Sequence, residues 1–283
     1  RHIIMAYILT IDLEDWFHGF ESNIEKWDSY PSLIENHTLY ILDLLDLYNA
    51  KATFFVLGDV ANKFPNLIKE IFNRGHEIGS HGMNHKFVNS QSLEHFQHDI
   101  LESINILKNI INAPILSYRA PYFSITEDNK CVLKILRDEG VLFDSSIFPG
   151  ISPWHGIAKT PRLPYHPIDG LLECPISTLP FLFFNLPFSG GAYLRILPSF
   201  LINNLTKYTV NKDNYHMIYL HPYDLFPDQP RVKLKSIFWT WRRYAGLKNA
   251  ETKIRTLLSN GEYTSLKNAM KNNAGYQSKM AIA

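Results

Sequence analysis

Short apolar runs alternate with longer stretches of helical spacing along the first two-thirds of the chain. The short runs predict buried strands at residues 7–12, 52–57, 76–80, 115–119 and 141–145. Apolar positions three and four apart predict helices at residues 33–48, 60–73, 93–111 and 127–139, the last ending at Gly140. This strand–helix alternation predicts a parallel sheet connected by crossover helices.

The pattern changes after residue 148. Nine prolines interrupt residues 149–198, which predicts loops and short strands. Residues 215–220 predict a further strand, and residues 239–258 predict a basic helix followed by a polar tail. Because there is neither an internal repeat nor a linker, we expect one α/β domain over residues 1–283, a barrel rather than an open sheet. Residues 231–283 would form a helical C-terminal extension.

Composition narrows the class of protein. The chain has 283 residues, 46% of them hydrophobic, and a formal net charge of +1, which argues against a dedicated nucleic-acid or membrane-surface protein. No apolar stretch is long enough for a transmembrane segment. The two cysteines are too far apart in sequence for a disulfide framework or a zinc knuckle. No signal peptide is visible, so we expect a cytoplasmic or membrane-peripheral protein, or a periplasmic one if a leader was removed.

Acidic residues gather at the end of the first predicted strand. Asp12, Glu14 and Asp15 follow its apolar residues. A single acid after a strand often caps the next helix. Three acids close together are costly unless a cation binds them or their pKa values differ from one another. Strand alternation places Asp12 and Glu14 on one face, with Asp15 beyond at the turn.

A histidine pair follows the third predicted strand. His81 and His85 are four residues apart, and one helical turn would place both imidazoles on the same side. His95 and His98 form a similar pair, but they lie inside an ordinary helix. One acid with two histidines leaves coordination positions open for water and substrate, as in a hydrolytic metal site.

Two further strand ends carry polar residues. Arg119 leaves the fourth predicted strand, where it could hold a carboxylate, although an arginine is more often on the surface. His221 ends the last predicted strand and is held by Pro222, so it is a candidate proton donor or acceptor. A histidine satisfied within the core is the alternative. In parallel α/β folds such strand ends converge on one site.

Together these segments resemble the motif series of the polysaccharide deacetylase family, which has NodB homology and is similar to carbohydrate esterase family 4. The most specific is GHEIGSHGMNH at residues 75–85. Five others resemble a branch from bacterial exopolysaccharide and lipopolysaccharide gene clusters: TIDLEDWFHGF, YRAPYFSI, FDSSIFP, SGGAYLRILP and YLHPYDLFPDQPR. The resemblance runs from about Tyr7 to the helix after Pro230.

The resemblance implies a distorted (β/α) barrel of about seven strands and a divalent metal held by one acid and two histidines. Zinc is the usual metal, with cobalt or manganese as alternatives. By the resemblance, His81 and His85 are metal ligands, Asp12 is the general base, Arg119 orients Asp12, and His221 protonates the leaving amine. A backbone N–H near Tyr122 would hold the oxyanion.

The chain departs from the family pattern at the first motif. Many members have two adjacent acids there, whereas Leu13 separates Asp12 from Glu14 and Asp15. The strand geometry favours Glu14 as the third metal ligand, and the reach past the strand end favours Asp15. The wall of the acetyl pocket has no matching motif; its candidates are Leu220, Trp154 and Tyr193. Trp154 and Tyr122 are candidate sugar contacts.

The expected function is removal of N-acetyl groups from amino sugars of a bacterial surface polysaccharide or its precursor, with an N-acetylated glycan as the partner. Amide hydrolysis requires an activated water, a stabilised oxyanion and an acid for the nitrogen. With Asp12 ionised and His221 protonated, we expect a bell-shaped pH–rate profile. The alternatives are hydrolysis of another amide, a formyl group or a small non-sugar amide, or an inactive carbohydrate-binding member of the fold.

Overall fold

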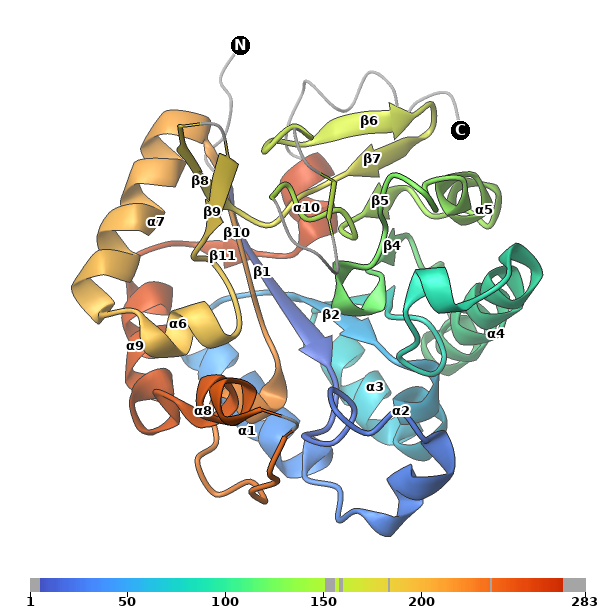
Figure 1. The fold of residues 1–283 in the computed structure, drawn as a ribbon, viewed down its shortest axis with the longest axis horizontal. Coiled ribbons are helices and arrows are strands. Elements are labelled where there is room, and N and C mark those ends of the chain that lie inside the picture. The colour runs from blue at the N-terminus through green and yellow to red at the C-terminus, as the bar shows by residue number, and fades with distance from the viewer. Residues whose placement is uncertain (1–5, 151–155, 158–159, 183, 235, 272–283) are drawn as a thin grey trace.

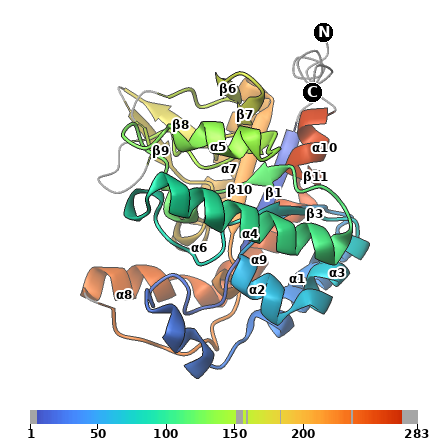
Figure 2. The ribbon, with the colours of Figure 1, turned by 90° about the vertical axis from the view of Figure 1, so that its right-hand side faces the viewer.

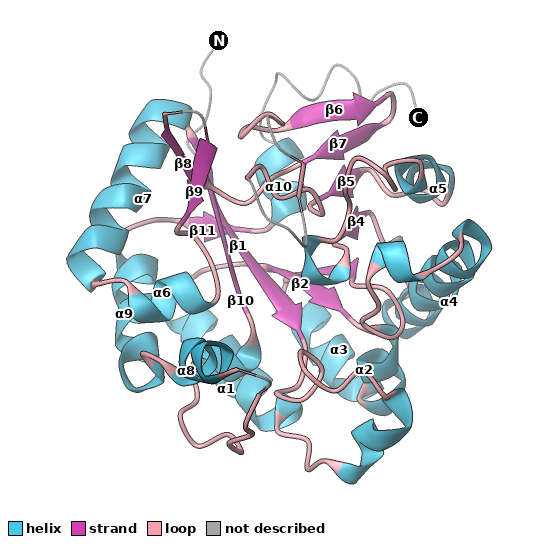
Figure 3. Ribbon diagram, in the orientation of Figure 1, coloured by secondary structure: helices cyan, strands magenta, loops and turns pink. Residues whose placement is uncertain are grey.

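The computed structural model describes residues 6–150, 156–157, 160–182, 184–234 and 236–271. Within them, one nine-stranded sheet has the order β10-β1-β2-β3-β4-β5-β7-β6, and β11 also pairs with β1. The strands from β10 to β7 are parallel, and β6 runs antiparallel to β7. Helices surround the curled sheet (Figure 1, Figure 3). No pairing among the described residues joins β6 to β10, so the barrel expected from the sequence is an open half-barrel.

The strands are β1 (Ala6–Leu13), β2 (Thr53–Val56), β3 (Glu77–Ser80), β4 (Ser117–Tyr118), β5 (Phe143–Asp144), β6 (Tyr165–Ile168), β7 (Leu171–Glu173), β8 (Thr178–Phe181), β9 (Phe184–Pro187), β10 (Tyr215–Leu220) and β11 (Tyr263–Thr264). The α-helices are α1 (Ile34–Leu47), α2 (Gly58–Lys63), α3 (Pro65–Asn73), α4 (Leu93–Ile111), α5 (Val132–Asp138), α6 (Ala192–Ile196), α7 (Ser199–Asp213), α8 (Ile237–Tyr244), α9 (Ala250–Ser259) and α10 (Leu266–Lys271). Short 3-10 helices lie at Ile24–Ser29, Val88–Ser90, Pro121–Phe123, Pro222–Asp224 and Leu247–Asn249.

Two of the predicted helices are divided. Residues 60–73 form the end of α2 and all of α3, because Pro65 starts a new helix after Phe64. Residues 239–258 are split between α8 and α9 at Gly246, which has φ +75°. A Cβ at this glycine would lie 2.1 Å from the carbonyl oxygen of Arg195, so the close approach requires glycine.

The C-terminal segment contributes to the sheet itself. Tyr263 of β11 pairs with Tyr7 of β1, on the same side as β2. The backbone N–H of Leu266, at the start of α10, donates to Thr53 Oγ1 at 2.8 Å. The next backbone N–H, of Lys267, donates to Glu77 Oε2 at 2.9 Å. Residues 263–271 are therefore packed, and the predicted helical extension is in part a component of the core.

The proline-rich middle forms short strands, as expected. The β6–β7 hairpin extends the main sheet, and β8 with β9 forms a separate two-stranded sheet. The aromatic side chains of the described residues are mostly buried or partly buried, but several on β8, α7 and α8 are exposed. No helix in the described ranges is long and apolar enough to cross a membrane.

Candidate active site

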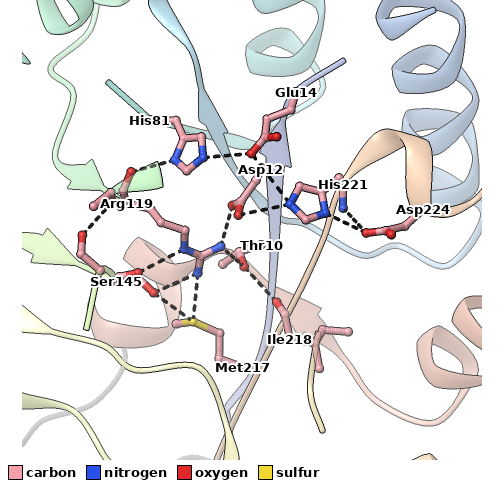
Figure 4. A network of polar contacts seen from close by, with 12 residues as sticks. Thr10, Asp12, Glu14, His81, Arg119, Ser145, Met217, Ile218, His221 and Asp224 are labelled. Carbon is pink, nitrogen blue, oxygen red and sulfur yellow. Dashed lines mark hydrogen bonds and ion pairs between the residues drawn. The ribbon is translucent and has the colours of Figure 1, made fainter. Parts of the chain in front are cut away.

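Polar side chains from the ends of β1, β3, β4 and β10 meet at one edge of the sheet (Figure 4). These strands are parallel, and β1 lies between β10 and β2, so their carboxyl ends point to the same edge. The four strand ends singled out from the sequence are therefore brought together.

Glu14, His81 and His85 form the centre of this group. Glu14 Oε1 lies 3.2 Å from His81 Nε2 and 2.9 Å from His85 Nε2. All three side chains are buried, and their potential ligand atoms lie within 4.8 Å of one another. The predicted helical turn from His81 to His85 is wrong. The segment is a loop, with φ +74° at Gly82 and +51° at His85, and these bends bring the second imidazole to Glu14.

The three residues fit a divalent metal. The backbone carbonyl of Arg119 lies 2.7 Å from His81 Nδ1, so this nitrogen carries the proton and donates. The lone pair of His81 Nε2 then faces the carboxylate of Glu14 at 3.2 Å. Two electron-rich atoms at this separation are stabilised by a cation between them. One carboxylate oxygen with two imidazole nitrogens suits zinc, cobalt or manganese.

Glu14 is the better-placed acid of the two that the sequence left open. Burial alone would raise its pKa, but nearby His85 and His221 and the hydrogen bond from His85 hold the pKa well below its usual range. The carboxylate is therefore ionised, as a metal ligand must be.

Asp15 does not join this group. Its Oδ1 accepts from the backbone N–H of Trp16 at 2.8 Å, and its Oδ2 accepts from the hydroxyl of Ser32 at 2.5 Å. The backbone N–H of Leu33, just before α1, also donates to Asp15 at 3.1 Å. Burial raises its pKa, opposed by these hydrogen bonds. Asp15 thus holds the connection from β1 to α1, and its carboxylate lies outside the Glu14–His81–His85 group.

Asp12 is fixed by a buried arginine. Arg119 Nη1 donates to Asp12 Oδ1 at 2.7 Å, and the same nitrogen donates to Thr10 Oγ1 at 2.9 Å. The Arg119 side chain is fully buried, so the surface alternative does not hold. Its guanidinium carbon lies 4.3 Å from the ring centroid of Phe55. Asp12 Oδ1 is thereby occupied, and its Oδ2 faces the site.

The other guanidinium nitrogens of Arg119 are also bound. Nε donates to the carbonyl of Ser145 at 3.2 Å, and Nη2 donates to the hydroxyl of the same residue at 2.9 Å. Thr10 Oγ1 in turn donates to the carbonyl of Ile218 on β10 at 2.9 Å. The network links β1, β5 and β10 and fixes the position of the guanidinium (Figure 4).

His221 stands opposite, at the end of β10. Its Nδ1 lies 2.8 Å from Asp224 Oδ2, and its Nε2 lies 4.0 Å from Asp12 Oδ2 and 3.8 Å from Glu14 Oε1. Burial lowers its pKa, but the negative charges of Asp224, Glu14 and Asp12 outweigh burial and raise the pKa to about 9. His221 is protonated at neutral pH in this arrangement, with Nε2–H directed at the two carboxylates.

Asp224 is held by a second arginine and by the backbone. Arg195 Nε donates to Asp224 Oδ1 at 2.8 Å, and the backbone N–H of His221 donates to Oδ2 at 2.9 Å. Burial raises its pKa, but Arg195 and His221 outweigh that effect and hold the pKa below its usual range. The ring of Tyr223 stacks on the imidazole of His221 at 4.7 Å. Asp224 was not among the predicted site residues, although a carboxylate three residues after the strand-end histidine is a signal visible in the sequence.

The predicted substrate contacts fall into three groups. Tyr122 lies beside the site, stacked on Phe87 at 4.0 Å with its ring 4.4 Å from that of His85. It has φ +59°, and the described part of the chain offers its backbone N–H no acceptor. Leu220 is buried and lines a small internal cavity, and Tyr193 lies under the guanidinium of Arg242 at 5.5 Å. Trp154 lies outside the described residues.

A cavity next to the end of β1 was missed. It has a volume of about 200 Å³, and His18, Asp59 and Trp27 are among its lining residues. His18 Nδ1 accepts from the backbone N–H of Asp15 at 3.0 Å, and its buried Nε2 has no partner among the described residues. Asp59 Oδ2 lies 4.0 Å from this nitrogen. The motif TIDLEDWFHGF contains His18, but nothing in the sequence showed that α2 would face it.

Two family models match the chain. Residues 26–141 match the polysaccharide deacetylase model, and residues 145–271 match a model described as Domain of unknown function (DUF3473). The first model includes His81, His85 and Arg119. Residues 26–141 are therefore similar to the polysaccharide deacetylase family, in agreement with the resemblance of the sequence motifs.

Similar curated proteins include peptidoglycan deacetylases. A peptidoglycan-N-acetylglucosamine deacetylase of Bacillus cereus is 36% identical over 104 residues, which are 37% of this chain and 47% of that protein. A peptidoglycan deacetylase of Helicobacter pylori is 27% identical over 151 residues, 52% of this chain and 50% of that protein. The chain thus spans about half the length of these relatives.

A solved structure shares the fold over nearly the whole chain. The crystal structure of a Mycobacterium smegmatis protein assigned to the polysaccharide deacetylases has a TM-score of 0.66 at 18% sequence identity. The match covers 99% of this chain and 92% of that one. The segment with the second family model therefore belongs to the same architecture as the first.

Proposed function

We propose that this domain is a metal-dependent hydrolase that removes N-acetyl groups from amino sugars of a bacterial surface polysaccharide or its precursor. The observation that carries the proposal is the arrangement of three groups at one sheet edge. These are the Glu14–His81–His85 cluster, the Asp12–Arg119 ion pair and the His221–Asp224 pair.

Different residues of the chain have different roles in amide hydrolysis. Glu14, His81 and His85 would hold the metal, which supplies Lewis-acid polarisation of the amide oxygen and of the attacking water. Asp12 takes a proton from that water through Oδ2, because Arg119 occupies Oδ1. His221 gives the Nε2 proton to the leaving nitrogen, and Asp224 compensates the imidazolium charge.

Tyr122 is the candidate for the oxyanion contact. Its unbonded backbone N–H and its position beside His85 support this role. A polar donor is most effective there when water is excluded, and the stacked Phe87 and Tyr122 rings cover that side of the site. Leu220, Tyr193 and Trp154 remain candidates for the acetyl pocket.

A sugar substrate is supported by the relatives. The Bacillus cereus and Helicobacter pylori proteins are named for deacetylation of peptidoglycan. The motif resemblance to the exopolysaccharide and lipopolysaccharide branch supports a surface polysaccharide or its precursor. The cavity of about 200 Å³ beside His18, which has the aromatic side chain of Trp27 in its wall, is a candidate for part of the glycan site.

Acetate release from N-acetylated glycans tests the proposal. Wild type should release acetate, lose this activity with a chelator and regain it with zinc, cobalt or manganese. Asp12→Asn should lower the rate by about 10²–10⁴-fold while the metal content is unchanged, because only proton transfer is removed. His81→Ala should lose both metal and activity, and His95→Ala on the surface of α4 is its matched control.

Three results separate the alternatives. Activity that survives both Asp12→Asn and His81→Ala would overturn the mechanism. Release of formate, or turnover of a small non-sugar amide in preference to N-acetylated glycans, would favour hydrolysis of another amide. Glycan binding without acetate release after metal loading would favour an inactive carbohydrate-binding member.

A further inference from the structure

Helix α8 exposes an unusual amount of apolar surface. None of its described residues is buried. The side chains of Ile237 and Phe238 are 86% and 59% exposed, and those of Trp239 and Trp241 are 47% and 55% exposed. Exposed apolar residues scattered singly are ordinary, but four on an eight-residue helix form a patch that marks an interaction surface.

The same part of the chain is strongly basic. Residues 229–250 contain six basic residues and no acidic residue: Arg231, Lys233, Lys235, Arg242, Arg243 and Lys248. The net charge of the whole chain is only +1, so the rest of the chain is net negative. The near-neutral net charge of the chain argued against a membrane-surface protein, but the chain contains one segment in which positive charge is concentrated.

The inner side of α8 is held by polar contacts rather than by its aromatic residues. Arg243 Nη2 donates to the carbonyl of Trp16, and its guanidinium carbon lies 4.6 Å from the ring centroid of Tyr223. Tyr244 Oη accepts from the backbone N–H of Val232 at 2.8 Å. Ser236 caps the helix by accepting from the backbone N–H of Trp239. The tryptophans are thus left facing outward in a helix whose position is fixed.

A second element exposes apolar side chains on the same side of the molecule. Figure 2 shows the β8–β9 hairpin and α8 on one side of the ribbon. Phe181 and Leu182 of the hairpin are 49% and 81% exposed, and Leu186 is 38% exposed. Helix α8 and the β8–β9 hairpin thus expose apolar side chains at two separate places on one side of the molecule, which suits an extended, flat partner.

We propose that α8, together with the β8–β9 hairpin, docks this domain onto the surface of an anionic lipid bilayer. Tryptophan and phenylalanine side chains partition into the boundary between headgroups and acyl chains, and basic residues around them pair with anionic headgroups. A glycan fits this surface less well, because the side chains of Ile237 and Leu182 cannot hydrogen-bond to a sugar. A neutral glycan also carries no negative charge to pair with the basic residues. The proposal does not depend on the proposed reaction.

Vesicle flotation of the full chain tests the proposal. The protein should float with vesicles of phosphatidylcholine mixed with phosphatidylglycerol, should not float with phosphatidylcholine alone, and should be released by salt. The combined variant Phe238→Ser, Trp239→Ser and Trp241→Ser should weaken binding by about tenfold or more. The combined variant Lys233→Glu and Lys248→Glu should weaken it by about tenfold or more.

Matched controls use equally exposed residues on other faces. Leu47→Ser with Leu93→Ser removes apolar surface from α1 and α4, and Lys69→Glu with Lys108→Glu reverses charges on α3 and α4. Both should bind like wild type, and all variants should share one thermal unfolding midpoint. Absence of wild-type binding to the anionic vesicles, or binding that survives the triple serine variant, would overturn the proposal. So would a change in tryptophan fluorescence with soluble N-acetylglucosamine oligomers and none with vesicles, which would assign the patch to a glycan.

Discussion

Two groups of buried carboxyl groups lie at the carboxyl ends of the same sheet, and they differ in what surrounds them. Asp12, Glu14 and Asp224 each face an arginine or a histidine. Asp144 at the end of β5 and Glu173 at the end of β7 face chiefly each other. The first group is paired with positive charge, and the second is not.

The second pair is held by neutral donors. Ser146 Oγ donates to Asp144 Oδ1, and the backbone N–H of Ile147 donates to Glu173 Oε1 at 3.1 Å. Burial raises the pKa of Asp144 to about 6, while burial and the neighbouring Asp144 raise the pKa of Glu173 well above its usual range. Burial therefore favours the protonated form of both carboxyl groups, and the neighbouring Asp144 adds to this effect at Glu173.

The comparison shows that burial at a strand end does not by itself make a carboxylate reactive. Desolvation raises the pKa in both groups, at Glu14 and Asp224 as well as at Asp144 and Glu173, so the difference in charge comes from the cationic partner. Charged carboxylates capable of metal binding and proton transfer are found where arginine and histidine converge. The ends of β5 and β7 instead carry Asp144 and Glu173, whose pKa values are raised by burial.

The largest expected effect is the difference between substituting Glu14 and substituting Glu173. Glu14→Gln should lower acetate release by about 10³-fold or more, because the metal supplies several kcal/mol of transition-state stabilisation. The metal-to-protein ratio should fall with it, measured by elemental analysis. Glu173→Gln replaces a neutral acid by a neutral amide of the same shape and should leave both quantities close to wild type. Equal losses of acetate release and of metal in the two variants would contradict the difference between the two groups of carboxyl groups.

A smaller effect concerns His221. Asp224→Asn removes the first of the negative charges that raise the pKa of His221 to about 9. The protonated fraction should then decline at a lower pH, so the alkaline limb of the pH–rate profile should move to lower pH. At pH 8 the rate should fall by about 10–100-fold. Asp144→Asn is the control, and an alkaline limb in the same place for Asp224→Asn would show that the charge of Asp224 does not act on this proton.

The smallest effect concerns stability. Asp144 and Glu173 have raised pKa values in the folded protein, so they bind more protons folded than unfolded as pH rises from about 4 to beyond 6. Below the pKa values of the unfolded chain, these two carboxyl groups do not reduce the free energy of unfolding. As pH rises above those values, the free energy of unfolding falls. The double variant Asp144→Asn and Glu173→Gln should therefore be more stable than wild type at pH 7 by about 1–2 kcal/mol.

Urea unfolding at pH 4 and pH 7 measures this difference. The gain of the double variant should become smaller at pH 4, where both carboxyl groups are protonated in the folded protein and about half-protonated in the unfolded chain. A gain of equal size at both pH values would mean that packing rather than proton binding is responsible.

The sequence predicted the elements that depend on local patterns. The bounds of α4 and β10 are those expected from spacing, and β1 extends the predicted run by one residue at each end. The convergence of Asp12, His81, Arg119 and His221 followed from the rule that parallel strands end at one edge.

The features that sequence missed depend on contacts between distant segments. The surroundings of Asp15 depend on Ser32 and Leu33, which donate hydrogen bonds to its carboxylate. The loop that carries His85 depends on a positive φ at a residue other than glycine, which composition does not indicate. The pairing of His18 with a cavity required α2 to pack against the β1–α1 connection.

The position of β1 in the sheet has a consequence for how the protein is made. Ile8 lies opposite Met217 of β10 on one side and Thr264 of β11 on the other. β1 is therefore synthesised before β10 and β11, and both of its edges stay incompletely paired until those strands are made. Pairing over such sequence separations also makes folding slow. Glu14, His81 and His85 all precede β10 and β11 in the chain, so they are translated before the sheet that positions them can close around β1.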